Sequence, residues 1–347
     1  MEMTNRLLPL ACHVLAWSLA FIGQCLAAPE QVIQIGTDGQ RYPFLVFANQ
    51  PLQITQDERI EQAVVILHGV RRNADHYFAI GQTLLERAQL PSRQTLLLAP
   101  NFLVPTDNRA RNDLPLWRND SWMHGEPAGF GRVGVSAFQA LDDIVGYLAD
   151  REHFPALKRI TLIGHSAGAQ LMQRYAMLNP QDERLRQAGV AVRYVISSPS
   201  SYLYLDASRP QPQGFAPLTA PKCPTYNHYR YGLIGSPAYL LRQRLNGKQL
   251  FQRYAARDVT YLVGSDDNDP ANRRLDTSCG AELQGSNRLE RQLNYRAYEQ
   301  YLGERWGVRV NHRQFQVSGV GHSATGLYGS PLTVRKLFPG GKTQPSD

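Results

Sequence analysis

RITLIGHSAGAQLMQRYAMLNP, residues 159–180, joins two kinds of segment through one short turn. Apolar residues dominate 159–163, which predicts a buried strand, and helical spacing of apolar residues predicts a helix over 167–178. The turn carries Ser166 with a glycine two positions to either side. Such glycines allow a sharp strand-to-helix corner that lifts a serine clear of the sheet. The stretch therefore indicates a nucleophilic serine, with a serine that merely caps a tight turn as the alternative.

Alternation of strand-like and helical patterns along the chain predicts an α/β fold, with a mostly parallel central sheet flanked by helices. The long stretch 201–257 exceeds what a loop in a compact domain needs, so we interpret it as a lid-like insertion between late strands. We expect one helix in it, over 236–255. Further strands are expected at 31–36 and 41–48 (an opening hairpin), 62–69, 94–100, 192–201, 258–267 and 309–319, and further helices at 73–90, 135–150 and 288–306.

Length and charge narrow the class of protein. The 347 residues, 43% hydrophobic and 19% charged, suit a single large domain with a sizeable core. The net charge of +8 comes from scattered arginines rather than one basic strip. This indicates a generally basic exported protein, and we expect no nucleic-acid partner.

The first 27 residues predict a secretory signal peptide. Arg6 precedes an apolar run without charges, and small residues Cys25 and Ala27 mark a cleavage point. A permanent membrane anchor is the alternative, but the run is marginal for spanning a bilayer. We therefore expect residues 28–347 to be secreted or periplasmic, with no stable membrane insertion after cleavage.

Two cysteines, Cys223 and Cys279, stand outside this leader. An even pair in an exported protein predicts one disulfide, with two buried free thiols as the alternative. Their spacing, without a nearby histidine cluster, matches no zinc site, so we expect no metal.

An activated serine needs two backbone N–H donors for the oxyanion that forms on the substrate. The residue after the nucleophile, Ala167, supplies one. The loop after strand 62–69 supplies the other, with Val70 as our candidate and Arg71 in reserve. His68, at the end of that strand, is interpreted as a support for the loop.

The base and acid should come late in the chain. His322 lies in a glycine-rich turn after a strand and is our candidate base, whereas His312 within that strand should point sideways. His228, in the insertion, is its rival. For the acid we choose Asp267 from a loop after the preceding strand, where Asp266 and Asp269 are alternatives and a solvated turn would also explain all three.

Taken in chain order, LHGV (67–70), GHSAG (164–168), VGSDD (263–267) and GVGHS (319–323) resemble the oxyanion loop, nucleophile elbow, acid loop and histidine loop of the α/β-hydrolase superfamily. The likeness covers nearly the whole mature chain and is strongest to a group of secreted microbial serine hydrolases and esterases. It implies hydrolysis through an acyl-serine without metal or organic cofactor.

The substrate is less defined by the sequence. We expect a pocket for a small-molecule or polymer ester to be lined by three residues from aromatic segments rich in loop-forming residues, Trp117, Trp122 and Tyr229. Packing of these loops against the sheet would explain the same residues equally well. An amidase or peptidase with the same triad is the nearest rival function. A non-catalytic polymer-binding protein on the same fold is the rival of another class.

Overall fold

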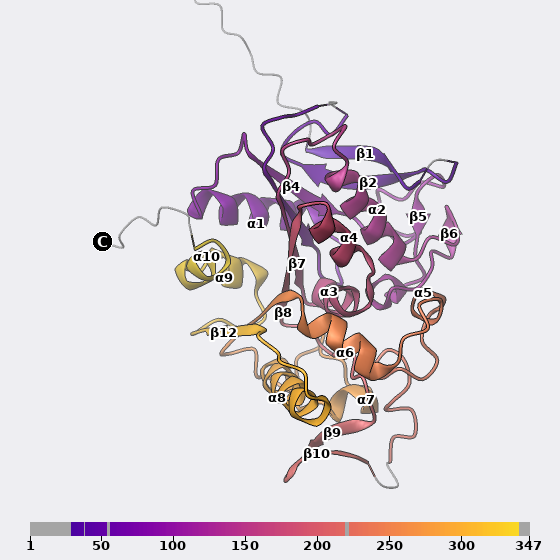
Figure 1. Ribbon diagram of the computed structural model, residues 1–347, viewed down its shortest axis with the longest axis vertical. Helices are drawn as coiled ribbons and strands as arrows, with labels where there is room; N and C mark the ends of the chain where they lie inside the picture. Colours follow the sequence, from indigo (N-terminus) through magenta and orange to yellow (C-terminus); the bar gives the residue numbers. More distant parts are fainter. Residues whose placement is uncertain (1–28, 38, 54–55, 219–221, 340–347) are drawn as a thin grey trace, which may run out of the picture.

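The computed structural model describes residues 29–37, 39–53, 56–218 and 222–339 (Figure 1). The predicted signal peptide, residues 1–27, lies outside the described residues. None of the helices in the described ranges is both long and apolar enough to cross a membrane.

One sheet of eight strands organises the chain, in the order β1-β2-β4-β3-β7-β8-β11-β12. The opening hairpin is antiparallel, as expected, and β2 also runs antiparallel to β4; every later pairing is parallel. The strands are β1 Glu30–Ile35, β2 Tyr42–Ala48, β3 Gln62–Leu67, β4 Thr95–Pro100, β7 Arg159–His165, β8 Ala191–Ser197, β11 Asp258–Gly264 and β12 Arg313–Val317.

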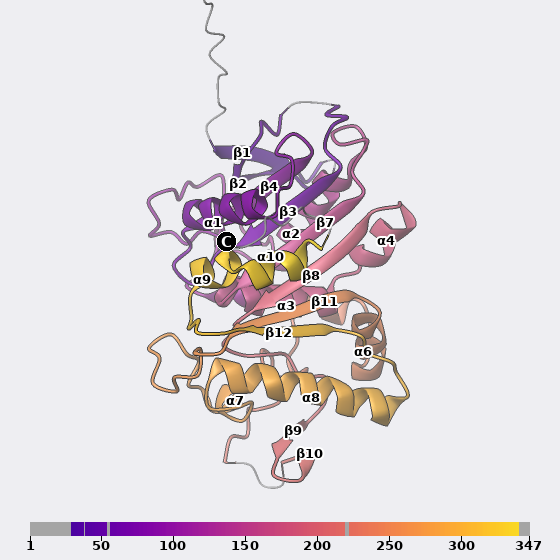
Figure 2. The same ribbon diagram turned by 90° about the vertical axis from the view of Figure 1, so that its left-hand side faces the viewer.

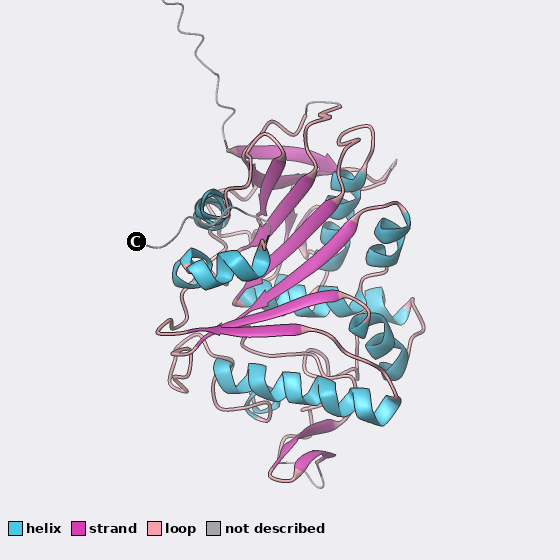
Figure 3. Ribbon diagram, turned by 60° about the vertical axis from the view of Figure 1, so that its left-hand side comes forward, coloured by secondary structure: helices cyan, strands magenta, loops and turns pink. Residues whose placement is uncertain are grey.

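Helices cover both faces of this sheet, which confirms the predicted fold class (Figures 2 and 3). The longer ones are α1 Ala74–Arg87, α2 Ala137–Ala149, α3 Ala167–Leu178, α4 Gln181–Gln187, α6 Gly247–Ala255, α8 Arg288–Trp306, α9 Ala324–Gly329 and α10 Pro331–Leu337. Short elements complete the chain: β5 Pro115–Leu116, the 3₁₀ helix η1 Ser121–His124, β6 Phe130–Gly131, β9 Ser208–Gln211, β10 Gly214–Pro217, α5 Ala238–Leu241 and α7 Cys279–Glu282.

Alternation along the parallel strands sorts the core into two layers. In β3, Val64 and Ile66 pack with side chains of α1, α9 and α10 on one face. Val65 and Leu67 face the other way and join the larger cluster with α2, α3, α6 and α8. Because successive strand side chains point to opposite faces, a run of apolar residues serves both layers at once.

Two helix predictions differ from the structure. The helix expected over 236–255 is two helices, because the chain turns before Asn246, whose side chain and that of Gln249 form a capping box that starts α6. The first helix begins after Asn73 as expected, but the Asn73 side chain makes no capping hydrogen bond and the helix ends at Arg87.

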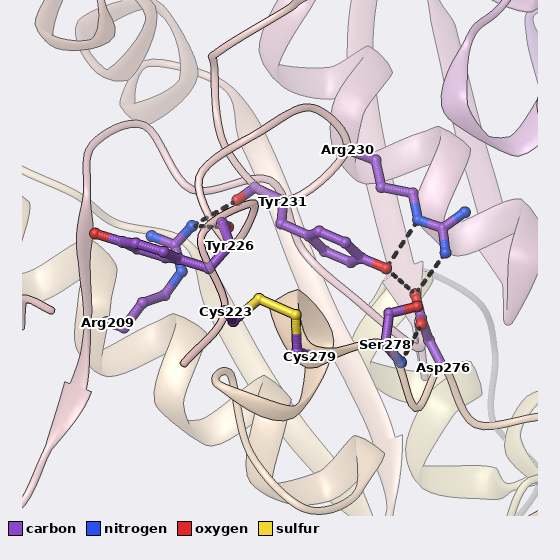
Figure 4. Close-up of a disulfide and its surroundings, with 8 residues drawn as sticks. All are labelled: Arg209, Cys223, Tyr226, Arg230, Tyr231, Asp276, Ser278 and Cys279. Atoms are coloured by element: carbon purple, nitrogen blue, oxygen red, sulfur yellow. Dashed lines mark hydrogen bonds and ion pairs between the residues drawn. A yellow bond between two sulfur atoms is a disulfide. The ribbon is translucent and has the colours of Figure 1, made fainter. Parts of the chain in front are cut away.

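Between β8 and β11 the chain leaves the sheet and forms β9, β10, α5 and α6. Figures 1 and 2 both place the β9–β10 hairpin at the opposite end of the molecule from β1. Within this stretch Cys223 forms the predicted disulfide with Cys279, the first residue of α7 (Figure 4). The bond ties the excursion to the segment that follows β11.

Candidate active site

Ser166 occupies the corner between β7 and α3. Its backbone has φ 57° and ψ −119°, a region that non-glycine residues seldom adopt and that costs about 1–3 kcal/mol. A Cβ at Gly164 would lie 2.4 Å from the Gly168 carbonyl oxygen, and one at Gly168 would lie 2.5 Å from that of His68. Both glycines are thus required by close backbone approach, and the corner holds the serine hydroxyl at the carboxyl edge of the sheet.

The structure brings together the three side chains expected to form a triad. His322, in the loop between β12 and α9, places Nε2 2.9 Å from Ser166 Oγ. Its Nδ1 lies 2.8 Å from Oδ2 of Asp267, in the loop after β11. Of the two alternative acids, Asp266 accepts a hydrogen bond from the Ser265 hydroxyl and Asp269 from the backbone N–H of Ala271, so only Asp267 reaches the imidazole.

The loops that carry the histidine and the carboxylate are joined by backbone hydrogen bonds. Ser265 N–H donates to the Val317 carbonyl at 2.9 Å, and Asp266 N–H to the Val320 carbonyl at 3.0 Å. A Cβ at Gly264 would lie 1.8 Å from the Val320 oxygen, so the loops could not approach this closely with a side chain there. The relative position of imidazole and carboxylate therefore follows from the pairing of β11 and β12.

The electrostatics favour a neutral imidazole beside an ionised carboxylate. Burial lowers the pKa of His322 below its usual 6.5, outweighing the opposing hydrogen bond to Asp267. Burial alone would raise the pKa of Asp267, but the hydrogen bond from His322 and the charge of Arg288 hold it below its usual value. His322 can thus accept a proton near neutral pH.

Arg288, at the start of α8, was not predicted from the sequence. Its side chain is fully buried, and Nη1 lies 3.3 Å from Asp267 Oδ1. The guanidinium also donates to the Arg274 carbonyl at 2.7 Å and to Ser200 Oγ at 3.2 Å. It holds the carboxylate by the oxygen that His322 does not contact, and it also holds the neighbouring chain segment.

The two expected oxyanion donors, Val70 and Ala167, line the same cavity as Ser166. Neither backbone N–H donates a hydrogen bond to another group in the described chain, so both remain free for a ligand. Arg71, the reserve, lines a second cavity on the other side of the serine. The geometry is compatible with the predicted pair.

His68 supports the loop that presents Val70. Its ring is buried, its Nε2 accepts from the Phe102 N–H at 3.0 Å, and its Nδ1 lies 2.9 Å from the Gly69 carbonyl. Because Nε2 accepts, the proton sits on Nδ1 and donates to that carbonyl. This agrees with the interpretation of His68 as a loop support.

A second histidine, missed in the sequence, lies under His322. His165 stacks on the His322 ring with centroids 4.8 Å apart, and its Nδ1 bonds to the Tyr77 hydroxyl at 2.8 Å. Burial keeps the pKa of His165 well below 6.5, so the ring beneath the base is neutral. The sequence signal that could have identified His165 is its position directly before Ser166.

Two cavities meet at Ser166. The larger, of about 390 Å³, is also lined by Met123, Gln170, Ser200 and the stretch 273–278, with Arg230 from the excursion. The smaller, of about 210 Å³, is lined by His322 and residues 323–325, with Arg274 shared between the two cavities. A substrate bound across the serine would place one portion in each.

The aromatic residues expected in the pocket lie elsewhere. Trp117 and Trp122 are fully buried in the hydrophobic core, where both contact Phe102. Tyr229 packs against that core and its hydroxyl donates to the His124 carbonyl. None of the three lines either cavity, because Trp117 and Trp122 pack inside the core and Tyr229 packs against it.

The remaining candidates occupy structural positions. His312 directly precedes β12 and is buried, with Nδ1 3.0 Å from Glu299 and Nε2 2.9 Å from the Tyr254 carbonyl. The rival base His228 sits in a turn closed by its N–H to the Thr225 carbonyl and has no hydrogen bond to Ser166. In the described ranges, no group of three or more histidine, cysteine, aspartate or glutamate residues is arranged to hold a metal ion.

Known structures resemble this fold, although no family model and no curated protein sequence matches the chain. A poly(3-hydroxybutyrate) depolymerase from Bordetella parapertussis has a TM-score of 0.61 and 20% identity, covering 90% of this chain and 91% of its own. A poly(aspartic acid) hydrolase from Sphingomonas sp. KT-1 has a TM-score of 0.59 and 20% identity, over 86% and 95%. Both likenesses support the α/β-hydrolase fold expected from the four motifs.

Proposed function

We propose that this α/β-hydrolase-fold protein is a serine hydrolase that cleaves carboxylic esters through an acyl-serine intermediate. The observation that carries the proposal is the continuous hydrogen-bonded series from Ser166 through His322 to Asp267 at the carboxyl edge of the sheet. A hydroxyl, an imidazole and a carboxylate in this order constitute an activated nucleophile.

In the first half of the reaction, His322 Nε2 takes the Ser166 proton while Oγ bonds to the ester carbon. The carbonyl electrons move to oxygen, and the N–H groups of Val70 and Ala167 bind the oxyanion. Asp267 keeps the Nδ1 proton of the imidazolium in place. When the oxyanion collapses, the C–O bond breaks and His322 gives its proton to the departing alcohol, leaving an acyl-serine.

Water completes the cycle by the same proton transfers. The water oxygen attacks the acyl carbon while His322 accepts a proton from that water. His322 then gives the proton to Ser166 Oγ as the acyl–serine bond breaks. The products are a carboxylic acid and the restored enzyme. Every group used belongs to this chain.

Amide cleavage by the same groups is the second candidate. One of the two similar structures is named a poly(3-hydroxybutyrate) depolymerase and the other a poly(aspartic acid) hydrolase, so the fold alone does not select the bond. Turnover of a 4-nitrophenyl ester compared with the matching 4-nitroanilide separates ester from amide hydrolysis.

We further propose that residues 28–347 form one domain that works outside the cytoplasm after cleavage behind Ala27. The Cys223–Cys279 disulfide supports this location, because such bonds persist mainly in oxidising compartments. Mass spectrometry of the N-terminus of the exported protein tests the cleavage.

A fluorophosphonate probe tests the serine directly. We expect covalent labelling of the wild type and its loss in Ser166→Ala and His322→Ala. Asp267→Asn should lower kcat by about 10⁴-fold, because it disturbs the tautomer and charge of the imidazole. It should also lower stability, because it leaves the buried Arg288 without its carboxylate.

The rival residues provide matched controls. His228→Ala and Asp266→Asn should label and turn over as the wild type does, because neither side chain reaches the imidazole or the serine. Absence of labelling in the folded wild type would favour the non-catalytic binding protein over the hydrolase.

A further inference from the structure

We propose that the acyl portion of the substrate carries a carboxylate, which Arg273 and Arg274 bind at the mouth of the larger cavity. This inference rests on the proposed serine hydrolase and specifies its substrate class. Three features support it: the orientation of the substrate, the positive charges on the cavity wall and the buried positive charge behind that wall.

The direction follows from the base. The leaving group must receive its proton from His322, and His322 lines only the smaller of the two cavities. The leaving group therefore occupies the cavity of about 210 Å³, and the acyl chain extends past Ala167 into the cavity of about 390 Å³. Both chambers include Val70, Ser166 and Arg274, and the ester carbonyl sits beside the first two.

Arg273 and Arg274 follow each other on the wall of the acyl cavity, and both are exposed. Arg274 lies at the border with the smaller cavity and lines that one as well, whereas Arg273 lines the acyl cavity alone of the two. In the part of the chain that the structure describes, neither guanidinium forms an ion pair with a carboxylate. Their backbone is nevertheless held: the Arg274 carbonyl accepts from Arg288 at 2.7 Å and from Ser200 Oγ at 3.2 Å. Two free cations on a fixed backbone suit recognition of an anionic group.

The acidic groups of this cavity do not cancel that charge. Asp276 also lines the wall, but it accepts from Arg230 at 3.1 Å and from the Tyr231 hydroxyl at 2.8 Å, as Figure 4 shows. Its charge is therefore matched within the wall. Asp120 is the other carboxylate of this cavity and stands against two unmatched arginines.

A buried charge behind the cavity adds to the positive potential. Arg174 of α3 is fully buried and donates to the Gln170 and Arg230 carbonyls at 2.8 and 3.2 Å, and both of those residues line the cavity. Burial lowers the pKa of Arg174 only to about 10, so it stays charged at neutral pH. Its hydrogen bonds within the described chain go to two carbonyls and the Ser201 hydroxyl rather than to a carboxylate, and among the charges that act on it are those of Arg230 and Asp276.

Steady-state kinetics on two matched esters test the proposal. The anionic ester is mono-4-nitrophenyl adipate, whose acyl chain ends in a carboxylate, and the neutral one is 4-nitrophenyl hexanoate. We expect kcat/KM to favour the adipate by about tenfold at low salt, and the preference to shrink as salt screens the charges. Arg273→Gln and Arg274→Gln should each lower the adipate-to-hexanoate ratio by about fivefold.

Arg93→Gln is the matched control, because this exposed arginine lies before β4 at the opposite, amino edge of the parallel strands. It should leave both the ratio and the rates as in the wild type. A third ester, 3-carboxy-4-nitrophenyl hexanoate, carries its carboxylate on the leaving group and should show no comparable dependence on Arg273.

The outcomes separate this inference from the proposed function. Hydrolysis of both adipate and hexanoate with a ratio near one, unchanged by the arginine variants, would overturn the acyl carboxylate and leave the hydrolase intact. A preference that follows the leaving-group carboxylate instead would overturn the assignment of the cavities. Failure of the protein to label with the fluorophosphonate would refute the hydrolase itself.

Discussion

The carboxylate of Asp267 is held through both of its oxygens by two different elements. Oδ2 accepts from His322 in the loop after β12, and Oδ1 pairs with Arg288 at the start of α8. Asp267 and Arg288 have only 3% and 0% exposed side chains, so each would be an uncompensated buried charge without the other. Arg288 is therefore a positioning residue for Asp267 in the proposed triad.

Substitution of Arg288 should change the pH dependence as well as stability. The positive charge of Arg288 lowers the pKa of His322, so Arg288→Met should raise that pKa. Because the base must be unprotonated, kcat/KM of the variant should begin to fall at a higher pH than in the wild type as the solution is acidified. We also expect a loss of about 3–5 kcal/mol in unfolding free energy.

Arg291→Met is the control for burial. Arg291 lies on the same helix and is also buried, but it bonds to the carbonyls of Gly285, Ser200 and Asp276 rather than to the triad. Its loss should cost stability without moving the acid limb of the pH profile. Identical acid limbs in wild type and Arg288→Met would show that Arg288 has no electrostatic role at the base.

At the scale of elements, the site depends on how closely β3, β7 and α3 approach one another. Gly168 is the point of contact, because a Cβ there would lie 2.5 Å from the His68 carbonyl and 2.9 Å from Leu67 Cβ. Those atoms belong to the end of β3 and to the loop that presents Val70. The spacing between Ser166 and the loop that presents Val70 is thus set by a missing side chain.

Gly168→Ala should separate these elements and lower both stability and activity. We expect a loss of about 2 kcal/mol in unfolding free energy, as for overpacked cores, and a fall in kcat that exceeds any change in KM. The control is Gly146→Ala on the exposed side of α2, where a Cβ would meet no atom within 4 Å. That variant should gain up to about 1 kcal/mol from helix propensity. A Gly168→Ala protein as stable and active as the wild type would contradict the packing argument.

The local sequence predicts the turns that form this site better than it predicts the residues that surround them. The strand-turn-helix pattern around Ser166 and the glycine-rich loops before His322 and after β3 have signatures within a few residues, because tight turns depend on local chemistry. Arg288 has no such signature: its pairing with Asp267 arises from how α8 packs, 21 positions along the chain. The break in the helix over 236–255 did have one, the Asn246-to-Gln249 capping pattern.

The aromatic residues failed as pocket predictions for a related reason. An aromatic side chain in a loop looks the same in the sequence whether it faces a cavity or the core. Burial of Trp117 and Trp122 is decided by tertiary packing against Phe102, which no local pattern encodes. The positive charge on the wall of the larger cavity, by contrast, comes from the adjacent residues Arg273 and Arg274, which were not predicted from the sequence.

At the scale of the whole molecule, the disulfide joins two long segments that both contribute to the acyl cavity. Cys223 belongs to the excursion that carries Arg230, and Cys279 follows the stretch that carries Arg273 and Asp276. The ring of Tyr231 packs directly on Gly280, where a Cβ would lie 2.4 Å from it. The bond thus holds together a cavity wall whose two halves precede and follow β11 in the sequence.

Removing the bond should therefore loosen the wall more than the sheet. We expect the double variant Cys223→Ser, Cys279→Ser to lose about 4 kcal/mol of unfolding free energy, because the bond closes a loop across 56 positions. The melting temperature, read by circular dichroism, should fall by about 8 °C. Fluorophosphonate labelling of Ser166 should persist, since the triad sits on loops of the sheet, while turnover of an ester with a long acyl chain should fall.

Reduction of the wild type provides the control. Wild type treated with reductant should behave like the double variant, and the variant should not respond to reductant. Equal melting temperatures with and without the bond would mean that packing around Tyr231, rather than the disulfide, holds the two halves of the wall together.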